Sequence, residues 1–480
     1  MALRFYNTLS HSLEEFTPGQ AGEVRMYNCG PTVYSDPHIG NMRSFLLADL
    51  LRRVFDQRGF RTTQVMNITD VGHLTVDDVA DAAGEDKLEK MARAEGIDPY
   101  EIARRYEEVF FENLDILGAR RAHEYPRATE HVAEMITMIE ALIEKGHAYQ
   151  VDGVGVYFRV RSFPEYGRLS GNTLEDLDAG ARIEVDDRKE SPLDFALWKI
   201  DEKHLMQWDS PFGRGFPGWH IECSAMSEKY LGRTFDVHTG GEDNIFPHHE
   251  CERAQSLCSG DGEFARFWVH ARHLLVDGAK MSKSKGSFFT INDLLARGFE
   301  GYEIRYTLIS PHYRQPMNFT LDGLEGDRKA VARLRALGER LRGEGASGAP
   351  ASASAEWRER LKAAQAQFDA CLDDDLNVSG GLGVVHETAK ALGRGELGPD
   401  EAAAGLAFLE HADAILGVIF AESSQVEEGL SPEEQELLEA RGAAREARDW
   451  ARSDELRDAL LARGIVIKDG ADGVTWERRR

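Results

Sequence analysis

The sequence predicts an α/β protein whose parallel, Rossmann-like sheet contains an insertion and is followed by a helical bundle and a small C-terminal α+β module. Three observations predict this: a strand–helix–strand pattern near the N-terminus, a change of pattern between residues 115 and 200, and a helical composition after about Leu324. A chain of 480 residues is long enough for roughly three domains. We expect the sheet domain at 1–114 and 201–324, the insertion at 115–200, the bundle at 325–428 and the module at 429–480.

The first strand–helix–strand unit lies between residues 24 and 67. Val24 to Cys29 alternates like a buried strand, and Asn41 to Arg58 has apolar residues at helical spacing before Gly59. Thr62 to Asn67 is the second strand. Such a crossover places the helix N-terminus at the carboxyl edge of the strands, where α/β sheets bind nucleotides. His38 lies at that edge, although a lone histidine there is more often a helix cap.

The remaining elements follow from similar patterns. In the insertion we expect a helix, Thr129 to Lys145, and Gly-rich alternating segments at 153–161 and 166–172. The sheet resumes with Thr234 to His238, ends at Gly240 and Gly241, and continues past Phe267 to Val276. Beyond it we expect a flexible loop at Gly343–Ser354, a helix at Asp449–Arg463 and a strand at Ile465–Lys468.

Composition limits the class of protein. No apolar run approaches the ~20 residues of a membrane span, and Met1 to Ser10 does not resemble a targeting leader, so we expect a cytosolic protein. Five cysteines argue against a disulfide framework and favour reduced thiols as ligands or core residues. The net charge of −26 does not favour a nucleic-acid partner, yet RNA docks on local patches. Arginines cluster at 52–53, 104–105, 120–121 and 328–342, each cluster expected on a solvated helix face.

Two short motifs indicate activation of an acid with ATP. Lys280-Met-Ser-Lys283-Ser284, followed by Gly286, is typical of a mobile cationic loop that closes over a polyphosphate. Its usual partner, Pro37-His-Ile-Gly-Asn41, lies far upstream. Alone, the lysine segment would as readily be an ordinary solvated loop.

A second group of residues is rich in metal-ligand types. It comprises Trp219-His-Ile-Glu-Cys223 and Phe246-Pro-His-His-Glu-Cys-Glu252. If Pro247 opens a helix, His248 and Glu252 stand four apart on one face, and Cys223 and Cys29 could complete a site suited to Zn²⁺. Because the ligands are scattered and no CxxC pair exists, buried inert thiols and a salt-bridged helix remain open.

The motifs together resemble the class I aminoacyl-tRNA synthetases, and among them cysteinyl-tRNA synthetase. The resemblance extends through Tyr27 to Tyr34, Asn67 to Asp70, Gly218 to Met226, Phe246 to Glu250, Asp373 to Asn377 and Ala451 to Arg457. It implies ligation of L-cysteine to its tRNA through cysteinyl adenylate, by a monomer with ATP, Mg²⁺ and one Zn²⁺ per chain. The bundle would bind tRNA and the C-terminal module its anticodon.

The resemblance also implies roles for individual residues. His38, Gly40, Asn41, Lys280 and Lys283 would bind ATP, and all of these except Gly40 would act in catalysis. Zinc would be held by Cys29, Cys223, His248 and Glu252, and the amino acid by Thr69, Trp219, His220, His238 and Asp243. Zinc would prefer the thiolate of cysteine to the hydroxyl of serine, which would make an editing domain unnecessary.

Three departures and two alternatives accompany this resemblance; one departure is that Lys285 and Ser287 stand where the commoner pattern has neutral residues. Asn41 stands where the commoner motif has a second histidine, so an amide must serve as donor. The acidic segment Val71 to Asp86, with His73, is longer than the commoner pattern, and we expect a solvated surface loop rather than a metal site. The alternatives are a cysteine ligase acting on an amino sugar in thiol-cofactor synthesis and a non-catalytic RNA-binding relative. The residues after Asp373 favour the tRNA enzyme over the amino-sugar ligase. The presence of both phosphate motifs and all four expected zinc ligands disfavours a non-catalytic relative.

Overall fold

The chain forms two compact units, residues 1–422 and 423–480, in the computed structural model, and each is described by itself. The residues described are 2–76, 80, 83–180, 188–281, 287–423, 432–446, 449–461, 463, 465–470 and 473–478. Most of the lysine loop, Ser282 to Gly286, therefore lies outside the described residues, as do 77–79, 81 and 82 of the acidic segment. None of the described helices combines the length and apolar character that a membrane span needs.

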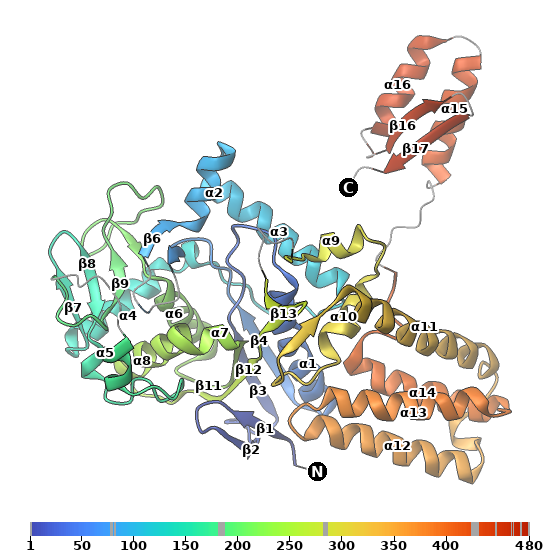
Figure 1. The fold of residues 1–480 in the computed structure, drawn as a ribbon, viewed down its shortest axis with the longest axis horizontal. Coiled ribbons are helices and arrows are strands. Elements are labelled where there is room, and N and C mark those ends of the chain that lie inside the picture. Colours follow the sequence, from blue (N-terminus) through green and yellow to red (C-terminus); the bar gives the residue numbers. More distant parts are fainter. Residues whose placement is uncertain are drawn as a thin grey trace. The chain divides into compact units, whose positions relative to one another are not determined.

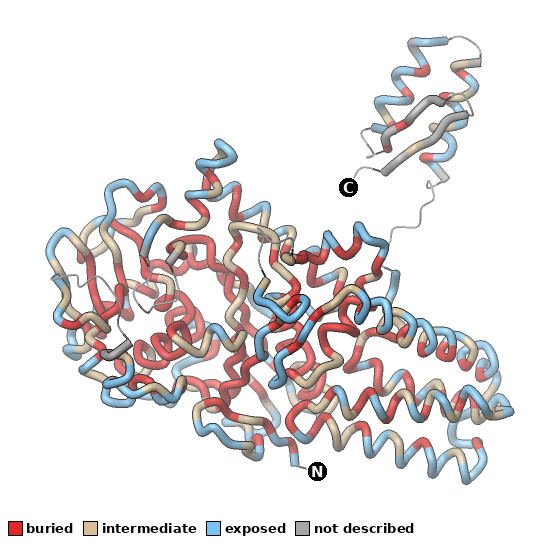
Figure 2. Tube along the Cα trace, in the orientation of Figure 1, coloured by how far each residue is buried: buried red, intermediate tan, exposed pale blue. Residues whose placement is uncertain are grey.

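A four-stranded parallel sheet forms the centre of the first unit, as predicted (Figure 1). Its order is β12-β11-β3-β4, made by β3 (Glu23–Asn28), β4 (Arg61–Met66), β11 (Thr234–Gly241) and β12 (Phe264–Ala271). Helices lie against it, and the buried residues concentrate in the sheet and these helices (Figure 2). A parallel sheet of this kind brings the carboxyl ends of its strands to one edge, which positions the residues that follow β3 and β11 close together.

Helix α1 (Ile39–Gln57) joins β3 to β4 and begins two residues before the predicted start. The reason is a reciprocal cap: Nδ1 of His38 accepts from the backbone N of Asn41 at 3.1 Å, and Oδ1 of Asn41 accepts from the backbone N of His38 at 3.2 Å. This capping box satisfies two backbone donors at the helix start. His38 is thus a helix cap, and the cap uses only one of its ring nitrogens.

The predicted insertion is a separate antiparallel layer. The sheet has the order β10-β9-β8-β7 and is drawn in green shades in Figure 1. Three of its strands, β7 (Ala148–Val151), β8 (Gly155–Phe158) and β9 (Phe195–Lys199), lie within the predicted bounds 115–200, and β10 (Phe216–Pro217) lies beyond them. Its helices are α3 (Pro99–Ile116), which leads into it, α4 (Val132–Glu144) and α5 (Leu174–Gly180). The predicted helix at 129 starts at Val132, after a short turn of 3₁₀ helix, and the segment 166–172 forms turns rather than a strand.

The second half of the sheet domain supplies the elements around the site. These are α6 (Trp219–Leu231), α7 (Glu242–Asn244), α8 (Glu250–Ser259), β13 (Leu274–Val276), β14 (Ala279–Lys280), α9 (Ile291–Leu295), α10 (Gly301–Ile309) and β15 (Met317–Phe319). The expected continuous run from Phe267 to Val276 is interrupted, because β12 ends at Ala271 and β13 joins a different sheet with β14 and β15. An N-terminal hairpin is formed by β1 (Arg4–Asn7) and β2 (Ser12–Glu15).

The acidic segment is not the solvated loop that the sequence suggested. Its described residues include an antiparallel hairpin of β5 (Leu74–Val76) and β6 (Ala83–Asp86), followed by α2 (Lys87–Glu95). His73 and Asp86 are buried, with 6% and 2% of their surface exposed. Asp86 caps α2 by accepting from the backbone N of Leu88 at 2.8 Å and of Glu89 at 3.2 Å. The cap that Asp86 provides for α2 and the burial of His73 therefore stabilise an ordered structure in this segment.

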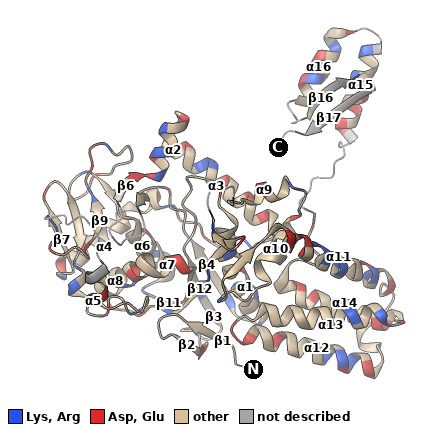
Figure 3. Ribbon diagram, viewed as in Figure 1, with Lys and Arg blue, Asp and Glu red and all other residues tan. Residues whose placement is uncertain are grey.

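A helical bundle follows the sheet domain, as predicted. Its helices are α11 (Leu321–Glu344), α12 (Ala355–Asp373), α13 (Val378–Arg394) and α14 (Pro399–Leu416). Lys and Arg lie along α11 (Figure 3), and several pack the bundle: Arg335 donates to the backbone oxygens of Val418 at 3.2 Å and Ile419 at 3.1 Å. The expectation that the arginine clusters lie on solvated faces is also wrong for Arg53, which is 9% exposed.

The second unit is a small α+β module. Helices α15 (Pro432–Glu446) and α16 (Trp450–Leu461) accompany an antiparallel pair, β16 (Ile465–Gly470) and β17 (Gly473–Arg478). Leu460, Ile465 and Ile467 form its buried core, and Trp476 packs against them. Trp476 therefore serves as a core anchor in this module.

Candidate metal centre and phosphate-binding motifs

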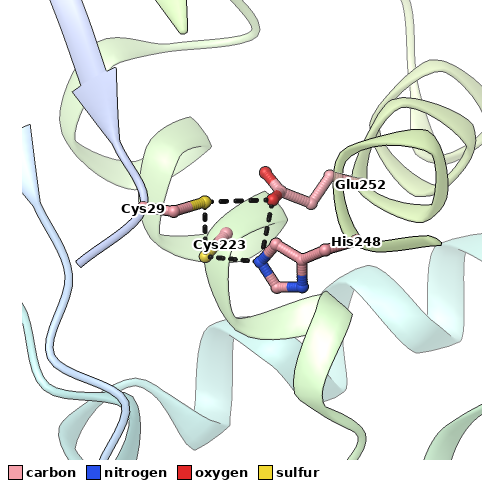
Figure 4. A group of neighbouring side chains, drawn as sticks. All are labelled: Cys29, Cys223, His248 and Glu252. Atoms are coloured by element: carbon pink, nitrogen blue, oxygen red, sulfur yellow. Dashed lines mark hydrogen bonds and ion pairs between the residues drawn. The ribbon is translucent and has the colours of Figure 1, made fainter. Parts of the chain in front are cut away.

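Four potential metal ligands from distant parts of the chain meet beside the central sheet. Cys29 directly follows β3, Cys223 lies in α6, His248 lies in the turn before α8, and Glu252 lies in α8. Neighbouring ligand atoms are close around the group (Figure 4): Cys29 Sγ to Cys223 Sγ 3.8 Å, Cys223 Sγ to His248 Nε2 3.6 Å, His248 Nε2 to Glu252 Oε1 3.0 Å and Glu252 Oε1 to Cys29 Sγ 3.4 Å. The ligand atoms all lie within 4.8 Å of one another.

Four of the six distances between these atoms match those expected around one tetrahedral Zn²⁺. Bonds of ~2.3 Å to sulfur and ~2.0–2.1 Å to nitrogen or oxygen require edges of about 3.8 Å between two sulfurs, about 3.5 Å between sulfur and nitrogen or oxygen, and about 3.4 Å between nitrogen and oxygen. The distances in the cluster differ from these by a few tenths of an ångström at most. Two thiols, an imidazole and a carboxylate are also a donor set that suits zinc.

The protonation states of the cluster prepare it for a cation. Burial acts to raise the pKa of Cys223, but hydrogen bonds from Cys29 and His248 outweigh it and lower this pKa to about 6. Burial and the neighbouring Cys223 raise the pKa of Cys29. Burial acts against protonation of His248, but the charge of Glu252 prevails and raises its pKa to about 10. The lowered pKa of Cys223 and the raised pKa of His248 favour an ion pair between the two side chains, and a bound metal ion would displace the proton of His248.

Backbone geometry before α8 differs from the helical start inferred from Pro247. Helix α8 begins at Glu250, and Ile245 to His249 form a separate wide turn in which Phe246 has a non-helical backbone. The pairing of His248 with Glu252 is kept because the turn leads directly into α8. The turn also brings His249 to the site, with Nε2 at 3.1 Å from Cys29 Sγ.

His249 was not among the residues that sequence reasoning selected. Its Nδ1 lies 2.8 Å from Nε2 of His270, and Nδ1 of His270 lies 2.8 Å from Oγ1 of Thr8. Cys29, His238, His249 and Glu252 also lie within 4.8 Å of one another and form a second possible ligand group. The sequence did contain an indication of its role, because His249 and Glu252 are three residues apart. This spacing, like the spacing of four between His248 and Glu252, places two side chains on one helical face.

Three of the five residues expected to line the amino-acid pocket contact the metal cluster: Trp219, His220 and His238. Nδ1 of His220 lies 2.8 Å from Nδ1 of His248, and the ring of Trp219 lies 4.2 Å from that of His248. Nε2 of His238 lies 2.8 Å from Oε2 of Glu252.

Thr69 instead contacts α6 away from the ligands: it donates to Oε2 of the buried Glu222 at 2.8 Å. Burial raises the pKa of Glu222 well above its ordinary value. Asp243 is exposed in α7, directly after β11, and no contact described for it joins it to the other four.

The two phosphate motifs meet at the start of α1, although some 240 residues separate them along the chain. The backbone N of Ile39 donates to Phe289 at 3.0 Å, and His38 pairs with Thr290 in an antiparallel bridge. A Cβ on Gly40 would lie 2.9 Å from Cε of Met281, so the Met281 side chain packs directly against the backbone of the upstream motif. Lys280 is exposed in β14, and Lys283 lies outside the described residues.

Comparisons with known proteins show the family to which this chain belongs. The family model of the class I (C) tRNA synthetase catalytic domain matches residues 15–329, a DALR domain matches 367–421 and a cysteinyl-tRNA ligase anticodon binding domain matches 427–476. The cysteine–tRNA ligases of Thermus thermophilus and Symbiobacterium thermophilum are 44% and 43% identical over 493 and 487 aligned residues, covering 100% of both chains in each case.

Solved structures show the same fold at low identity. A Mycobacterium tuberculosis methionyl-tRNA synthetase in complex with methionyl-adenylate has a TM-score of 0.61 and 15% identity, covering 90% of this chain and 96% of that one. An Agrobacterium radiobacter LeuRS in a ternary complex with tRNA has a TM-score of 0.61 and 12% identity, covering 84% and 85%. Fold and motifs together define a class I aminoacyl-tRNA synthetase. Within that class, the full-length matches show that the chain belongs to the cysteinyl-tRNA synthetase family.

Proposed function

We propose that this protein joins L-cysteine to its cognate tRNA in two steps, with Zn²⁺ selecting the substrate by its thiolate. The cysteine carboxylate attacks the α-phosphorus of ATP to give cysteinyl adenylate and pyrophosphate, and a terminal ribose hydroxyl of the tRNA then takes the cysteinyl group. The observation that supports this most directly is the close grouping of Cys29, Cys223, His248 and Glu252 beside the carboxyl ends of β3 and β11.

Cysteine has a sulfur atom where serine has an oxygen atom, and this is the only difference between them. Packing alone distinguishes groups that differ so little by about 1 to 3 kcal/mol. When bound by these four residues, zinc would have to accept the substrate sulfur as an additional ligand, and as a soft Lewis acid it would favour a thiolate there over a hydroxyl. His220 supports that position, because its Nδ1 lies 2.8 Å from Nδ1 of His248 and so holds the other ring nitrogen of His248 toward Cys223 and Glu252.

Catalysis of adenylate formation depends on phosphate contacts rather than acid–base chemistry. His38 and Asn41 stand at the N-terminus of α1, where backbone donors and the helix dipole favour an anion. Because Oδ1 of Asn41 serves the cap, its amide NH₂ is the group that can donate to a phosphate. Lys280 and Lys283 would stabilise the charge on departing pyrophosphate together with Mg²⁺.

Cysteine-dependent ATP/pyrophosphate exchange tests this function. We expect exchange with cysteine, little with serine, loss after removal of metal by a chelator, and recovery on addition of Zn²⁺. Exchange with serine at a comparable rate, or full activity in protein shown by elemental analysis to lack metal, would contradict the proposed selection by zinc.

Lys283→Ala should slow adenylate formation by about a hundredfold or more while leaving the affinity for cysteine nearly unchanged, because a cation that acts on developing charge contributes on the order of 3 kcal/mol. Lys285→Ala, in the same loop but outside the motif, is the matched control and should have a small effect. The rate of pyrophosphate exchange measures adenylate formation, and calorimetry measures the affinity for cysteine. An unchanged exchange rate in Lys283→Ala would refute the role.

Each domain is proposed to have the role that the sequence suggested. Residues 1–114 and 201–324 form the catalytic domain, interrupted by the insertion at 115–200. Residues 325–428 bind tRNA, and residues 429–480 bind its anticodon. The match of an anticodon binding domain to residues 427–476 supports tRNA, rather than an amino sugar, as the acceptor. Deletion from Gly429 onward should weaken aminoacylation at least about tenfold and spare pyrophosphate exchange. Equal loss of both activities would count against separate roles.

The remaining expectations are a monomer with one zinc per chain, acting in the cytosol. The tRNA, cysteine and ATP would be its partners. Sedimentation analysis together with the zinc content per chain tests the first two statements.

A further inference from the structure

The hairpin of β5 and β6 contacts two residues, Trp219 and His220, that lie against the metal cluster. The ring of His73 stacks on that of Trp219, with centroids 4.1 Å apart and planes inclined by 12°. The backbone oxygen of Ala80 lies 3.0 Å from Nε2 of His220. Trp219 and His220 both contact His248, at 4.2 Å between ring centroids and 2.8 Å between Nδ1 atoms. Two contacts from one hairpin thus converge on a single ligand of the cluster.

Hydrogen bonds fix the plane of the His73 ring. Nζ of Lys87 lies 3.0 Å from its Nε2, and Oγ1 of Thr32 lies 2.6 Å from its Nδ1. An ammonium group can only donate, so Nε2 accepts and Nδ1 carries the proton that it donates to Thr32. The backbone N of Lys87 also donates to the oxygen of His73 at 2.9 Å. The ring is therefore anchored at both nitrogens and cannot turn away from Trp219 without breaking them.

Close packing leaves this arrangement little freedom. Gly72 has a backbone φ of +74°, and a Cβ there would lie 2.7 Å from the oxygen of Pro217 and 3.6 Å from Oε1 of Glu222. The hairpin therefore approaches the loop before α6 at a position that only glycine permits. It meets the start of α6, the helix that contains Trp219, His220 and Cys223.

We propose that His73 is a positioning residue for cysteine binding: its anchored ring holds the Trp219 indole against His248 and so sets the wall of the amino-acid pocket. This inference depends on the proposed function, because it assigns Trp219 to that pocket. The contacts that carry this inference lead from His73 through Trp219 to His248, so its effect should fall on the amino acid.

Steady-state pyrophosphate exchange with His73→Ala tests the inference. Loss of a residue that orients a site from outside typically costs 10- to 100-fold, so the KM for cysteine should rise by about that factor. The KM for ATP should stay within about twofold of wild type, and the zinc content should remain at one per chain because all four ligands are kept. His73→Phe restores a ring that can stack and should recover most of the affinity for cysteine.

His204→Ala is the matched control. His204 is also a buried histidine beside this hairpin, stacked on Phe216 at 3.7 Å and held between Asp86 and Glu89. Its removal should lower the melting temperature without changing the KM for cysteine by more than about twofold. An unchanged KM for cysteine in His73→Ala, equal rises in the two KM values, or failure of His73→Phe to improve on His73→Ala would overturn the inference. Failure of the proposed function would instead appear in the wild type, as exchange that does not depend on cysteine or on metal.

Discussion

Cys223→Ser should release the bound metal and lower kcat/KM for cysteine activation by about a thousandfold or more, equivalent to at least about 4 kcal/mol of transition-state binding. Cys223 supplies one of two thiols in the cluster, and its Sγ lies 3.8 Å from Cys29 and 3.6 Å from Nε2 of His248. A serine hydroxyl stays protonated at neutral pH and is a poor ligand for zinc. The remaining three ligands would leave a site with one fewer thiolate and lower affinity.

Cys258→Ser is the matched control for this experiment. Cys258 is buried in α8, the helix that also contains Glu252, and burial raises its pKa to about 12, so it is an inert thiol. The control should keep one zinc per chain and full activity. Metal content by elemental analysis and pyrophosphate exchange are the two measurements.

The same experiment distinguishes the two possible ligand groups. If His249→Ala loses the metal while Cys223→Ser keeps it, the ion is held by Cys29, His238, His249 and Glu252 instead. If Cys223→Ser loses the metal and His249→Ala keeps it, the assignment made here is confirmed.

Asp49→Ala should lower the free energy of unfolding of the first unit by about 3–5 kcal/mol, because it leaves two buried guanidinium groups without their counter-charge. Oδ2 of Asp49 accepts from Arg305 Nη2 at 2.6 Å and from Arg53 Nε at 2.8 Å. All three side chains are nearly inaccessible to solvent.

The two arginines also bind the carboxyl ends of two helices. Arg305 donates to the backbone oxygen of Leu416 at 2.6 Å, and Arg53 donates to those of Ala414 at 3.1 Å and Gly118 at 2.6 Å. Ala414 and Leu416 lie in the last turn of α14, where carbonyls have no partner within the helix, and Gly118 lies just after α3. The arginines therefore connect α1 and α10 to α14 of the bundle and to the segment after α3. Loss of Asp49 would therefore weaken the joint between the sheet domain and the bundle.

Asp56→Ala on the same helix is the control. Asp56 lies 2.9 Å from Arg120 and 3.8 Å from Arg52, but its side chain is 32% exposed, so its loss should cost less than about 1 kcal/mol. Denaturant titration of the two variants against wild type measures the difference. Equal, small effects for Asp49→Ala and Asp56→Ala would contradict the importance of this buried group.

Acid should act on the same group. Burial acts to raise the pKa of Asp49, but Arg305 and Arg53 outweigh it and hold this pKa below its ordinary value. A carboxyl with a lowered folded-state pKa stabilises the protein above its unfolded-state pKa, and this stabilisation is lost as the pH falls through the folded-state value. Asp49→Ala should therefore show a smaller loss of stability on acidification than wild type does.

Much of the fold followed from short-range patterns. The strands β3 and β4 and the helix between them were predicted within two residues, because apolar periodicity and glycine breaks act over a few residues. The hairpin of β5 and β6 was not predicted, since its acidic composition resembles a surface loop. Its structure depends on contacts such as the stacking of His73 on Trp219, a residue far away in the sequence.

The sequence by itself determined which chemical groups the protein has: the lysine loop, the His38–Asn41 motif, and the four residues whose types suit zinc. Only the tertiary structure decided that Cys29 and Cys223, 194 residues apart, lie 3.8 Å from each other, and that His249 joins them. It likewise decided that Arg53 is buried against Ala414, 361 residues away. The physical reason is that helix and strand periodicity depends on neighbours along the chain, whereas packing of side chains from separate elements depends on a sheet and bundle that only the whole chain can build.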